Sequence, residues 1–384
     1  MGDCETKRTG KPLAVFTGGG TGGHVYPGIA VIERLRESGC CDFLWMGSAG
    51  GMEEDIARSW DIPFRGIPSG KLRRYFSVRN FTDIPRICCG FFVAFFIFLR
   101  RRPAVVFSKG GYVSFPPVLA AWFLRIPAIT HESDLDPGLA TRLNAFFVKK
   151  ICVPYEESRE YFPSRFRRKL VVTGNPVRRE IFGGRAEEGL RIAGFSADKP
   201  LLLVLGGSLG AREINELVRD SLDNLLPGVN IAHQTGGGGY GEISRPGYFA
   251  APYFSWELPH LLAAAVAVVS RAGAGSLWEF LVTEKPALLI PLKALSSRGD
   301  QLRNARFFER LGVAKVLYDE CPGVEGFSSA VRGLVDSRAC DTMRQAIRRI
   351  TGKDGEEGKD GKDRKDAAAL CAGMVLDYLV PGRE

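Results

Sequence analysis

The sequence predicts an α/β protein made of two Rossmann-like halves, each built on a parallel sheet. Three observations indicate this fold class. A short apolar strand, a glycine-rich turn and a helix follow one another within residues 13–37. The same succession recurs at 201–226, and the offset between Gly18 and Gly206 (206 − 18 = 188) is about half of the 384 residues. Apolar strand-like runs also alternate with helical stretches in both halves, as they do in doubly wound folds.

The composition is typical of a globular protein with a large core. Hydrophobic residues make up 45% of the chain and charged residues 25%, and the formal net charge is +9. This charge favours an anionic partner, such as a nucleotide, a nucleic acid or an acidic membrane surface. The nine cysteines show no metal-binding spacing, so we expect reduced cysteines and no metal. The polar segment 1–12 runs into a strand, which predicts a cytoplasmic protein without a signal peptide.

The first half carries a glycine loop between its first strand and its first helix, which is expected at 27–37. The loop, 18–24, lacks the spacing of the dinucleotide fingerprint, and no acid ends the second strand, so a nicotinamide site is disfavoured. His24 stands where the loop meets the helix. A neutral imidazole there is a candidate general base, although most lone histidines are structural. We expect the strands of this half at 13–17, 43–46, 105–107, 128–130, 151–153 and 170–172.

Polar residues follow the third and fourth of these strands, in the segments 108–116 and 131–138. Open α/β sheets bind ligands at the carboxyl ends of their strands, so both segments are candidates for a binding site. Asp134 and Asp136 resemble a metal-binding pair. Two-acid turns are common, however, and we expect no metal there.

The segment 64–102 is basic and ends in an apolar run rich in phenylalanine. It holds nine basic residues against one acid, Asp83. As a helix, the run 87–99 would rise only ~20 Å, short of the ~30 Å hydrocarbon core of a bilayer. Part of this helix is expected to pack behind the sheet. The surplus of phenylalanines among arginines predicts that the rest dips into an anionic membrane surface, and it favours a membrane over nucleic acid. The residues expected at the membrane are Phe91, Phe92, Phe95, Phe96, Arg73 and Arg74.

The second half carries the clearest candidate for a nucleotide-sugar site. A buried strand at 266–270 ends in the small-residue turn 271–276, and a helix is expected from Leu277. Glycines there let backbone N–H groups and the positive end of the helix dipole approach a phosphate. Glu279, one turn into the helix, is a candidate acceptor for the two hydroxyls of a ribose. For the glycines alone, an ordinary strand–helix connection is an equal alternative.

Two further places complete this candidate site. Asp300 and Gln301 begin a helix after the strand expected at 287–290, and their polar side chains suit sugar hydroxyls. Phe254 and Ser255 end another expected strand, where a planar base would pack on the ring of Phe254.

Together these motifs closely resemble the MurG family of UDP-N-acetylglucosamine transferases. They occur in the family's order over nearly the whole chain, and the ordered set is specific although no single motif is. This chain has Ser133-Asp134 where many members have Gln-Asn, and Asp300 where many have glutamine. The matching segments are 18–24, 110–114, 131–132, 174–178, 206–211 and 271–304.

The resemblance implies a GT-B fold, in which the parallel sheets of two Rossmann-like domains face a central cleft. Residues 1–174 would form a membrane-associating domain that binds the acceptor, lipid I (undecaprenyl-pyrophosphoryl-muramoyl-pentapeptide). Residues 175–360 would form the domain that binds the donor, UDP-N-acetylglucosamine, and 361–384 a helix that packs back on the first domain. The family further implies a peripheral place on the cytoplasmic face of the inner membrane, no cofactor and no nucleic-acid partner.

The resemblance also assigns roles to residues: Glu279 to the ribose, Asp300 and Gln301 to sugar hydroxyls, and Arg178, Ser208 and the turn 274–276 to the diphosphate. The full set expected at the donor is Thr21, Gly22, Gly23, Arg178, Ser208, Phe254, Ser255, Ala274, Gly275, Ser276, Glu279, Asp300 and Gln301. The set expected at the acceptor is Gly19, Gly20, Tyr112, His131, Glu132 and Asp134.

The implied reaction is an inverting glycosyl transfer to the C4 hydroxyl of the muramoyl sugar, which gives lipid II for peptidoglycan synthesis. His24 is expected to act as the base, and Arg178 with the turn 274–276 to stabilise the departing diphosphate. Two alternatives stay open. A soluble UDP-N-acetylglucosamine 2-epimerase would have little use for the basic, aromatic segment. A non-enzymatic nucleotide-sugar-binding protein at the membrane surface would not need His24.

Overall fold

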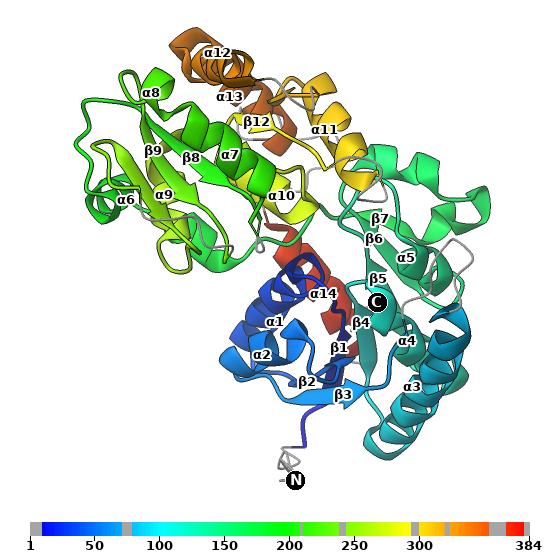
Figure 1. The fold of residues 1–384 in the computed structure, drawn as a ribbon. Coiled ribbons are helices and arrows are strands. Elements are labelled where there is room, and N and C mark those ends of the chain that lie inside the picture. Colours follow the sequence, from blue (N-terminus) through cyan, green and yellow to red (C-terminus); the bar gives the residue numbers. More distant parts are fainter. Residues whose placement is uncertain are drawn as a thin grey trace. The chain divides into compact units, whose positions relative to one another are not determined.

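The structure is a computed structural model that describes residues 10–70, 79–207, 210–237, 243–292, 299–318, 323–352 and 366–379, without the side chains of 79–82. It divides into two compact units (Figure 1). The N-terminal unit comprises Met1–Arg178 with Asp366–Glu384, and the C-terminal unit comprises Arg179–Lys365. The chain thus passes to the C-terminal unit after Arg178, within a few residues of the expected joint at 174–175.

The N-terminal unit is built on a seven-stranded sheet in the order β3-β2-β1-β4-β5-β6-β7. Every neighbouring pair is parallel. The central strands are short apolar runs that are buried on both faces, as parallel sheets require. The strands are β1 (Leu13–Thr17), β2 (Asp42–Ser48), β3 (Phe64–Ile67), β4 (Val105–Ser108), β5 (Ala128–His131), β6 (Lys150–Val153) and β7 (Leu170–Val172).

Helices cover both faces of this sheet (Figure 1). On one face, α1 (Tyr26–Ser38), α2 (Met52–Ser59) and α14 (Ala367–Leu379) share an apolar cluster with β1 and β2. On the other, α3 (Arg79–Arg101) and α4 (Phe115–Phe123) pack on the sheet, with α5 (Leu139–Asn144) beside α4. Four short 3-10 helices complete the unit: η1 (Gly22–His24), η2 (Tyr112–Ser114), η3 (Glu156–Tyr161) and η4 (Ser164–Lys169).

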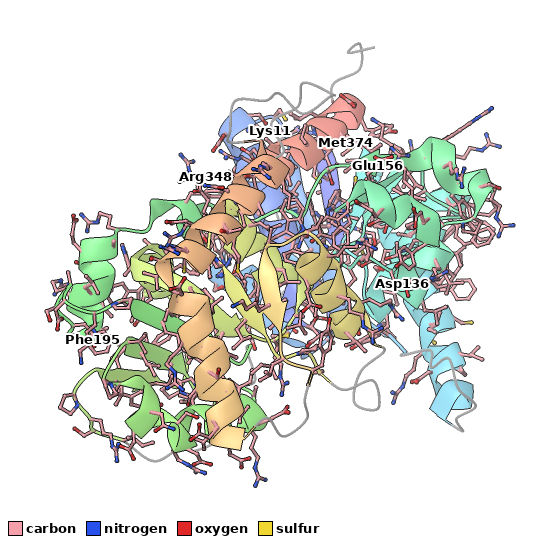
Figure 2. All side chains as sticks on the ribbon, turned by 90° about the horizontal axis from the view of Figure 1, so that it is seen from above. Lys11, Asp136, Glu156, Phe195, Arg348 and Met374 are labelled. Carbon is pink, nitrogen blue, oxygen red and sulfur yellow. The ribbon has the colours of Figure 1, made fainter. Side chains whose placement is uncertain are left out.

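The final helix, α14, is part of the core of the N-terminal unit. Cys371, Val375 and Leu379 are buried in the same cluster as α1. The Sγ of Cys152 on β6 lies 3.9 Å from the Sδ of Met374, which is labelled in Figure 2. Arg34 of α1 also forms an ion pair with Asp366, 2.5 Å apart, just before α14 begins.

The C-terminal unit repeats the pattern with six parallel strands in the order β10-β9-β8-β11-β12-β13. Its strands are β8 (Leu201–Leu205), β9 (Asn230–Gln234), β10 (Tyr248–Ala251), β11 (Ala265–Ser270), β12 (Ala287–Leu289) and β13 (Ala314–Val316). Its helices are η5 (Arg179–Gly183), α6 (Ala186–Ala193), α7 (Arg212–Asp220), α8 (Leu222–Leu225), α9 (Leu258–Ala264), α10 (Ala274–Val282), α11 (Asp300–Arg310), α12 (Gly323–Val335) and α13 (Ser337–Thr351). Helices α7, α8, α12 and α13 share one apolar cluster with the sheet.

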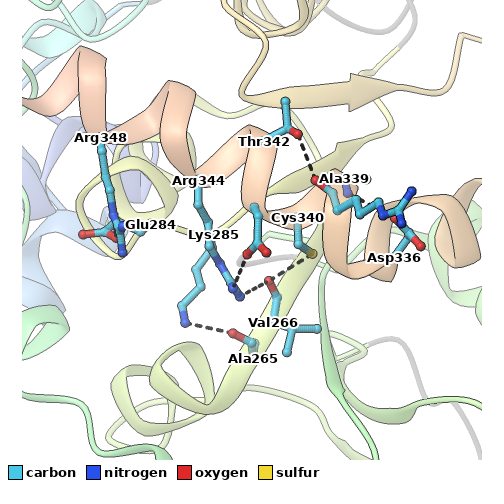
Figure 3. Close-up of polar contacts among 12 residues, drawn as sticks. Ala265, Val266, Glu284, Lys285, Asp336, Ala339, Cys340, Thr342, Arg344 and Arg348 are labelled. Atoms are coloured by element: carbon cyan, nitrogen blue, oxygen red, sulfur yellow. Dashed lines mark hydrogen bonds and ion pairs between the residues drawn. The ribbon is translucent and has the colours of Figure 1, made fainter. Parts of the chain in front are cut away.

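Side chains tie the amino end of β11 to the body of this unit (Figure 3). Lys285 Nζ donates to the carbonyl oxygens of Ala263 and Ala265, at 3.1 and 2.8 Å. Arg344 of α13 donates to the carbonyl of Val266 at 3.2 Å, and Arg348 pairs with Glu284 at 2.8 Å. These contacts fix the end of β11 that lies away from the glycine turn.

The two parallel sheets of the prediction are confirmed, two strands are missing from the prediction, and three local expectations are wrong. Strands β3 and β13 are short, amphipathic and not predicted. Strand β10 ends at Ala251, so Phe254 and Ser255 lie beyond it. Helix α10 begins at Ala274 and not at Leu277. Helix α3 has 23 residues, because the polar stretch before the apolar run is also helical, and it is roughly 34 Å long. Within the described ranges, no helix is both long and apolar enough to cross a bilayer.

Candidate active site

The first glycine loop follows β1 and is shaped by a buried carboxylate. Gly20 has a φ of +87°, which favours glycine, and its N–H donates to Glu53 Oε2 at 3.2 Å. Glu53 is fully buried in the first turn of α2 and also accepts from the N–H of Ser48 at 2.9 Å. A Cβ at Gly19 would lie 2.2 Å from Glu53 Oε1, so a larger residue there would have to displace the buried carboxylate. Sequence reasoning misses Glu53, because no local pattern marks it as buried.

His24 ends η1, and its half-buried ring is held on two sides. Its Nδ1 lies 2.9 Å from the hydroxyl of Thr21. A Cβ built at Gly110, on the second glycine loop, would lie 3.6 Å from His24 Cδ2. In the tautomer whose Nδ1–H donates to Thr21, the lone pair of Nε2 can accept a proton, as a general base requires.

The first and second glycine loops pack directly on each other. A Cβ at Gly111 would lie 2.4 Å from the carbonyl oxygen of Gly19, and one at Gly20 would lie 2.9 Å from the ring of Tyr112. Gly110 and Gly111 both have positive φ, at +82° and +75°. The structure therefore brings Gly19, Gly20 and Tyr112 together beside His24, as the sequence predicts for neighbouring strand ends.

The loop after β5 turns its two most prominent polar side chains inward. His131 is fully buried, and its Nε2 lies 2.9 Å from the carbonyl of Gly174. Glu132 accepts from the N–H groups of Ser133, Asp134 and Gly138, at 2.8, 3.2 and 2.9 Å. In this structure both side chains shape the loop, and the expected contact of His131 and Glu132 with the acceptor stays a prediction.

The acids of this loop have different surroundings. Asp136, labelled in Figure 2, forms an ion pair with Arg142 at 2.6 Å. Asp134 is half-buried. Among the described residues, no group of three or more histidine, cysteine or acidic side chains is placed to hold a metal ion.

Arg178, the last residue of the N-terminal unit, lies beside the first glycine loop. Its guanidinium carbon is 4.6 Å from the centre of the Tyr26 ring, at the start of α1. A Cβ at Gly22 would lie 3.1 Å from the same ring. Gly22 is buried, whereas Thr21 and Gly23 are exposed. Arg178, which is assigned to the donor diphosphate, thus packs on the Tyr26 ring, and this ring also adjoins Gly22 of the loop that carries His24.

In the C-terminal unit, the turn after β11 leads directly into α10. Gly273 is the N-cap, and Ala274, Gly275 and Ser276 form the first turn of the helix. A Cβ at Gly273 or Gly275 would meet no atom of the described residues within 4 Å, so there is room beside the backbone of this turn. The N–H groups of such a first turn and the helix dipole favour an anion. Glu279 is half-buried, one and a half turns further along α10.

The start of α11 lies against this turn. Asn304 is buried, and its Nδ2 donates to the carbonyl of Ala272 at 3.3 Å. Asp300 and Gln301 form the first turn of α11 and are half-buried. Gln301 Oε1 accepts from the N–H of Leu292 at 3.1 Å, which ties the helix to the end of β12. The expected sugar-contacting residues are therefore on an element joined to the α10 turn.

Phe254 and Ser255, two residues expected at the donor, lie just beyond the end of β10. The ring of Phe254 is only 1% exposed and stacks on Phe249 at 5.8 Å, so the expectation that a base packs on it is wrong here. Its N–H donates to Gln234 Oε1 at 3.0 Å. Ser255 is exposed, and its N–H donates to Glu257 at 2.8 Å. Ser208 lies outside the described residues.

Helix α3 and its neighbours carry an exposed aromatic patch, which we define as Phe92, Phe96, Trp122, Phe123 and Phe146. Half or more of most of these side chains is exposed, up to 62% for Phe96. Ring contacts through the half-buried Phe91, Phe95 and Phe147 connect them. Arg165 is exposed, and its guanidinium carbon lies 4.8 Å from the centre of the Phe146 ring. Arg73 and Arg74 lie outside the described residues.

Comparison with known proteins follows the same division into two units. The chain matches the glycosyltransferase family 28 N-terminal domain over residues 14–153 and the family's C-terminal domain over residues 201–356. The UDP-N-acetylglucosamine--N-acetylmuramyl-(pentapeptide) pyrophosphoryl-undecaprenol N-acetylglucosamine transferase of Treponema denticola is 45% identical over 327 residues, which cover 80% of this chain and 84% of that protein. The chain belongs to the MurG family of glycosyltransferase family 28.

Solved structures support the fold expected of the MurG family. The crystal structure of Acinetobacter baumannii MurG matches with a TM-score of 0.70 and 24% identity, over 95% of this chain and 99% of that chain. A UDP-N-acetylglucosamine 2-epimerase matches with a TM-score of 0.62 and 14% identity, over 97% of both chains. At these identities the matches show the fold alone, and the GT-B fold class is confirmed. Family membership, not fold, separates the MurG family from the epimerases.

Proposed function

We propose that this protein transfers N-acetylglucosamine from UDP-N-acetylglucosamine to the C4 hydroxyl of the muramoyl sugar of lipid I, giving lipid II and UDP. The observation that carries the proposal is the 45% identity over 80% of the chain to a relative named for this transfer. The geometry supports it, because the N-terminal unit places a candidate base on packed glycine loops. The C-terminal unit offers an open, glycine-capped helix N-terminus.

On the acceptor side, His24 Nε2 takes the proton of the attacking hydroxyl. The hydrogen bond between Thr21 and His24 Nδ1, at 2.9 Å, holds the ring for this task. The hydroxyl oxygen forms a bond to the anomeric carbon as the bond from that carbon to the UDP oxygen breaks. Because attack and departure are on opposite faces, the anomeric configuration inverts.

On the donor side, negative charge develops on the diphosphate as UDP leaves. The first turn of α10 supplies N–H groups and the positive end of the helix dipole, and Arg178 supplies a full charge. We assign the ribose hydroxyls to Glu279 and the sugar hydroxyls to Asp300 and Gln301.

The decisive assay is transfer of labelled N-acetylglucosamine from the UDP-sugar to a short-chain lipid I analogue. The expected result is a disaccharide product that requires the acceptor. Conversion of the UDP-sugar to its 2-epimer without any acceptor would replace the proposal with the epimerase. Binding of the UDP-sugar with neither reaction would leave only a nucleotide-sugar-binding protein.

We further propose that the aromatic patch holds the protein peripherally on an anionic membrane surface, the cytoplasmic face of the inner membrane. Exposed rings bury apolar area in the interface, and a neighbouring cation such as Arg165 contributes ~1 kcal/mol, which salt screens. Purified protein should sediment with anionic vesicles more than with neutral ones. The Phe92→Ser/Phe96→Ser variant should be released, whereas Phe182→Ser, an exposed ring of the C-terminal unit, should not be. Equal sedimentation of all three proteins would contradict this proposal.

A further inference from the structure

Lys109 is a buried cation that the proposed mechanism does not use. It directly follows β4 and precedes the two positive-φ glycines of the second loop. Its N–H donates to the carbonyl of Thr17 at 2.7 Å, which fixes its place at the carboxyl edge of the sheet. The residue is only 1% exposed. Lysine side chains are almost never fully buried unless they are paired, because burying the charged amino group costs free energy. The burial of Lys109 therefore indicates a specific function.

The amino group of Lys109 begins a chain of hydrogen bonds that crosses the N-terminal unit. Nζ donates to Ser133 Oγ, and Ser133 Oγ donates to Asn175 Oδ1 at 2.9 Å. Ser133 belongs to the loop after β5, and Asn175 lies three residues before the end of the unit. A second tie runs from His131 to the carbonyl of Gly174, at 2.9 Å. Lys109 therefore holds the loop that carries Asp134, and through it the start of the joint.

Charge gives Lys109 a second task. Burial lowers the pKa of Lys109 to about 8, and the carboxylates of Glu132 and Asp134 oppose this shift. The carboxylate of Glu132 is held by three backbone N–H groups, whereas that of Asp134 is half-buried and close enough to Lys109 to raise the pKa of its amino group. A carboxylate there repels an anionic diphosphate unless a nearby positive charge offsets it.

We propose that the ammonium group of Lys109 is a positioning group for the acceptor diphosphate: it orders the loop 132–138 through Ser133 and offsets the charge of Asp134. This inference rests on the proposed function and deepens it, because it names what keeps an acidic loop compatible with an anionic acceptor. Lys109 itself is buried and acts through the loop.

A double-mutant cycle in the transfer assay tests the proposal, with Lys109→Met, Asp134→Asn and the double variant. Methionine keeps the length of the side chain and removes its charge and its hydrogen bond. Lys109→Met should raise the acceptor KM by about tenfold and leave the donor KM within about twofold, and Asp134→Asn in that background should recover most of the loss. The exposed Lys149→Met is the matched control and should behave as wild type. The proposal would be overturned if Lys109→Met and the double variant had the same acceptor KM. It would also be overturned if the donor KM rose together with the acceptor KM in Lys109→Met.

The pH profile of the wild type gives a second readout, should Lys109→Met fail to fold. The titratable groups that face Lys109 are His131, Glu132, Asp134, Cys152 and Cys371. The pKa of His131 lies well below its usual value and that of Cys152 well above, so neither titrates near pH 8. The acceptor KM should rise as pH passes about 8, and Asp134→Asn should largely remove this rise because no carboxylate at position 134 is then left for Lys109 to offset. A flat profile in the wild type, or an equal rise in Asp134→Asn, would contradict the proposal.

Thermal unfolding of the same four proteins separates this inference from the proposed function. The cycle should show coupling between Lys109 and Asp134 near pH 7 and none near pH 10, where Lys109 is neutral. If the wild type transfers no sugar, the proposed function fails while this coupling still tests the charge offset. If the wild type is active and the cycle shows no coupling in either assay, the Lys109 inference alone fails.

Discussion

The two units place a cation at the same position of their sheets and use it differently. Lys109 follows β4 and Arg271 follows β11, the strand next to the first strand in each sheet. Each reaches the end of the next strand along: Lys109 binds Ser133 after β5, and Arg271 donates to the carbonyl of Ile290 after β12, at 2.9 Å. Arg271 also pairs with Glu213 at 2.8 Å. A guanidinium stays charged at any physiological pH, whereas a buried lysine titrates, so only the tie of the N-terminal unit responds to pH.

The candidate sites near these two cations also differ, because one is built mainly from side chains and the other mainly from backbone. The strand ends of the N-terminal unit carry buried polar side chains such as Lys109 and His131, and its candidate base, His24, is half-buried on the loop after β1. The candidate site of the C-terminal unit is made mainly of backbone, at the glycine-capped start of α10. The comparison predicts that side-chain changes in the N-terminal unit affect chemistry and acceptor binding, whereas changes in the C-terminal unit affect donor binding.

The largest effect is expected for the base. His24→Ala should lower kcat by ~10²–10⁴ and leave the donor KM nearly unchanged, because proton transfer is lost while the α10 site is intact. Steady-state kinetics with both substrates varied will measure this. A change confined to the acceptor KM would show that His24 binds the acceptor and is not the base. The N-terminal unit would then contribute binding but no base.

Each unit also buries a histidine, and these two should control acid stability. Burial lowers the pKa of His233 to about 4 and holds the pKa of His131 well below its usual value. The unfolded chain takes up protons below pH ~6.5 and the folded chain does not, so each histidine should cost ~1.4 kcal/mol of stability per pH unit as pH falls. For His233 this loss ends near pH 4.

Replacing one histidine tests this stability effect. His233→Gln should reduce the pH dependence of the urea midpoint of the C-terminal unit between pH about 6 and 4.5. His233 Nε2 lies 3.0 Å from Asn215 Oδ1 and its Nδ1 lies 2.8 Å from the Tyr248 hydroxyl, and a neutral ring satisfies both bonds. An unchanged slope in the variant would show that other groups control acid unfolding.

The donor site should respond to loss of its carboxylate. Glu279→Ala removes an acceptor of two ribose hydrogen bonds, an effect of ~1–3 kcal/mol, so the donor KM should rise about 5- to 150-fold. The acceptor KM should stay the same. Isothermal titration with UDP gives an independent value, and unaltered UDP affinity would remove Glu279 from the site.

The smallest effect concerns the caps of two helices in the C-terminal unit. Asp336 caps α13, where its side chain accepts from the N–H of Ala339 at 3.1 Å, whereas the N-cap of α10 is Gly273. Asp336→Ala should cost ~1 kcal/mol of stability and leave the donor KM alone. Gly273→Asn has ordinary φ and open space, so it should keep or slightly raise stability. Its donor KM should rise, because the new side chain competes with the diphosphate. Equal donor KM for both variants would argue against an anion at α10.

The sequence predicts the features that depend on local pattern. Apolar runs followed by glycine-bearing turns mark β1, β4, β8 and β11, and the helix expected within 361–384 is α14 (Ala367–Leu379). Strands β3 and β13 are not predicted from the sequence because each is short and carries a charged residue, Arg65 in β3 and Lys315 in β13. Their place is set by pairing with β2 and β12 at the edges of the sheets.

The direction of site side chains depends on tertiary packing and could not be predicted. From the sequence alone, Phe254 is a candidate to stack on the nucleotide base. Its ring contact with Phe249 shows that the side chain packs in the core instead. His131 and Glu132 look like ligand contacts until their partners on the backbone are known. Glu53 and Lys109 belong to the site only because distant segments bury them.

The place of α14 has a consequence for biosynthesis. The ribosome makes the N-terminal unit first, the C-terminal unit next and α14 afterwards, yet α14 covers one face of the first sheet together with α1. Until Asp366–Leu379 has left the exit tunnel, the nascent N-terminal unit exposes the apolar surface that Cys371, Val375 and Leu379 later cover. The C-terminal unit can complete its core during translation, whereas the unit that carries His24 reaches its native packing only afterwards.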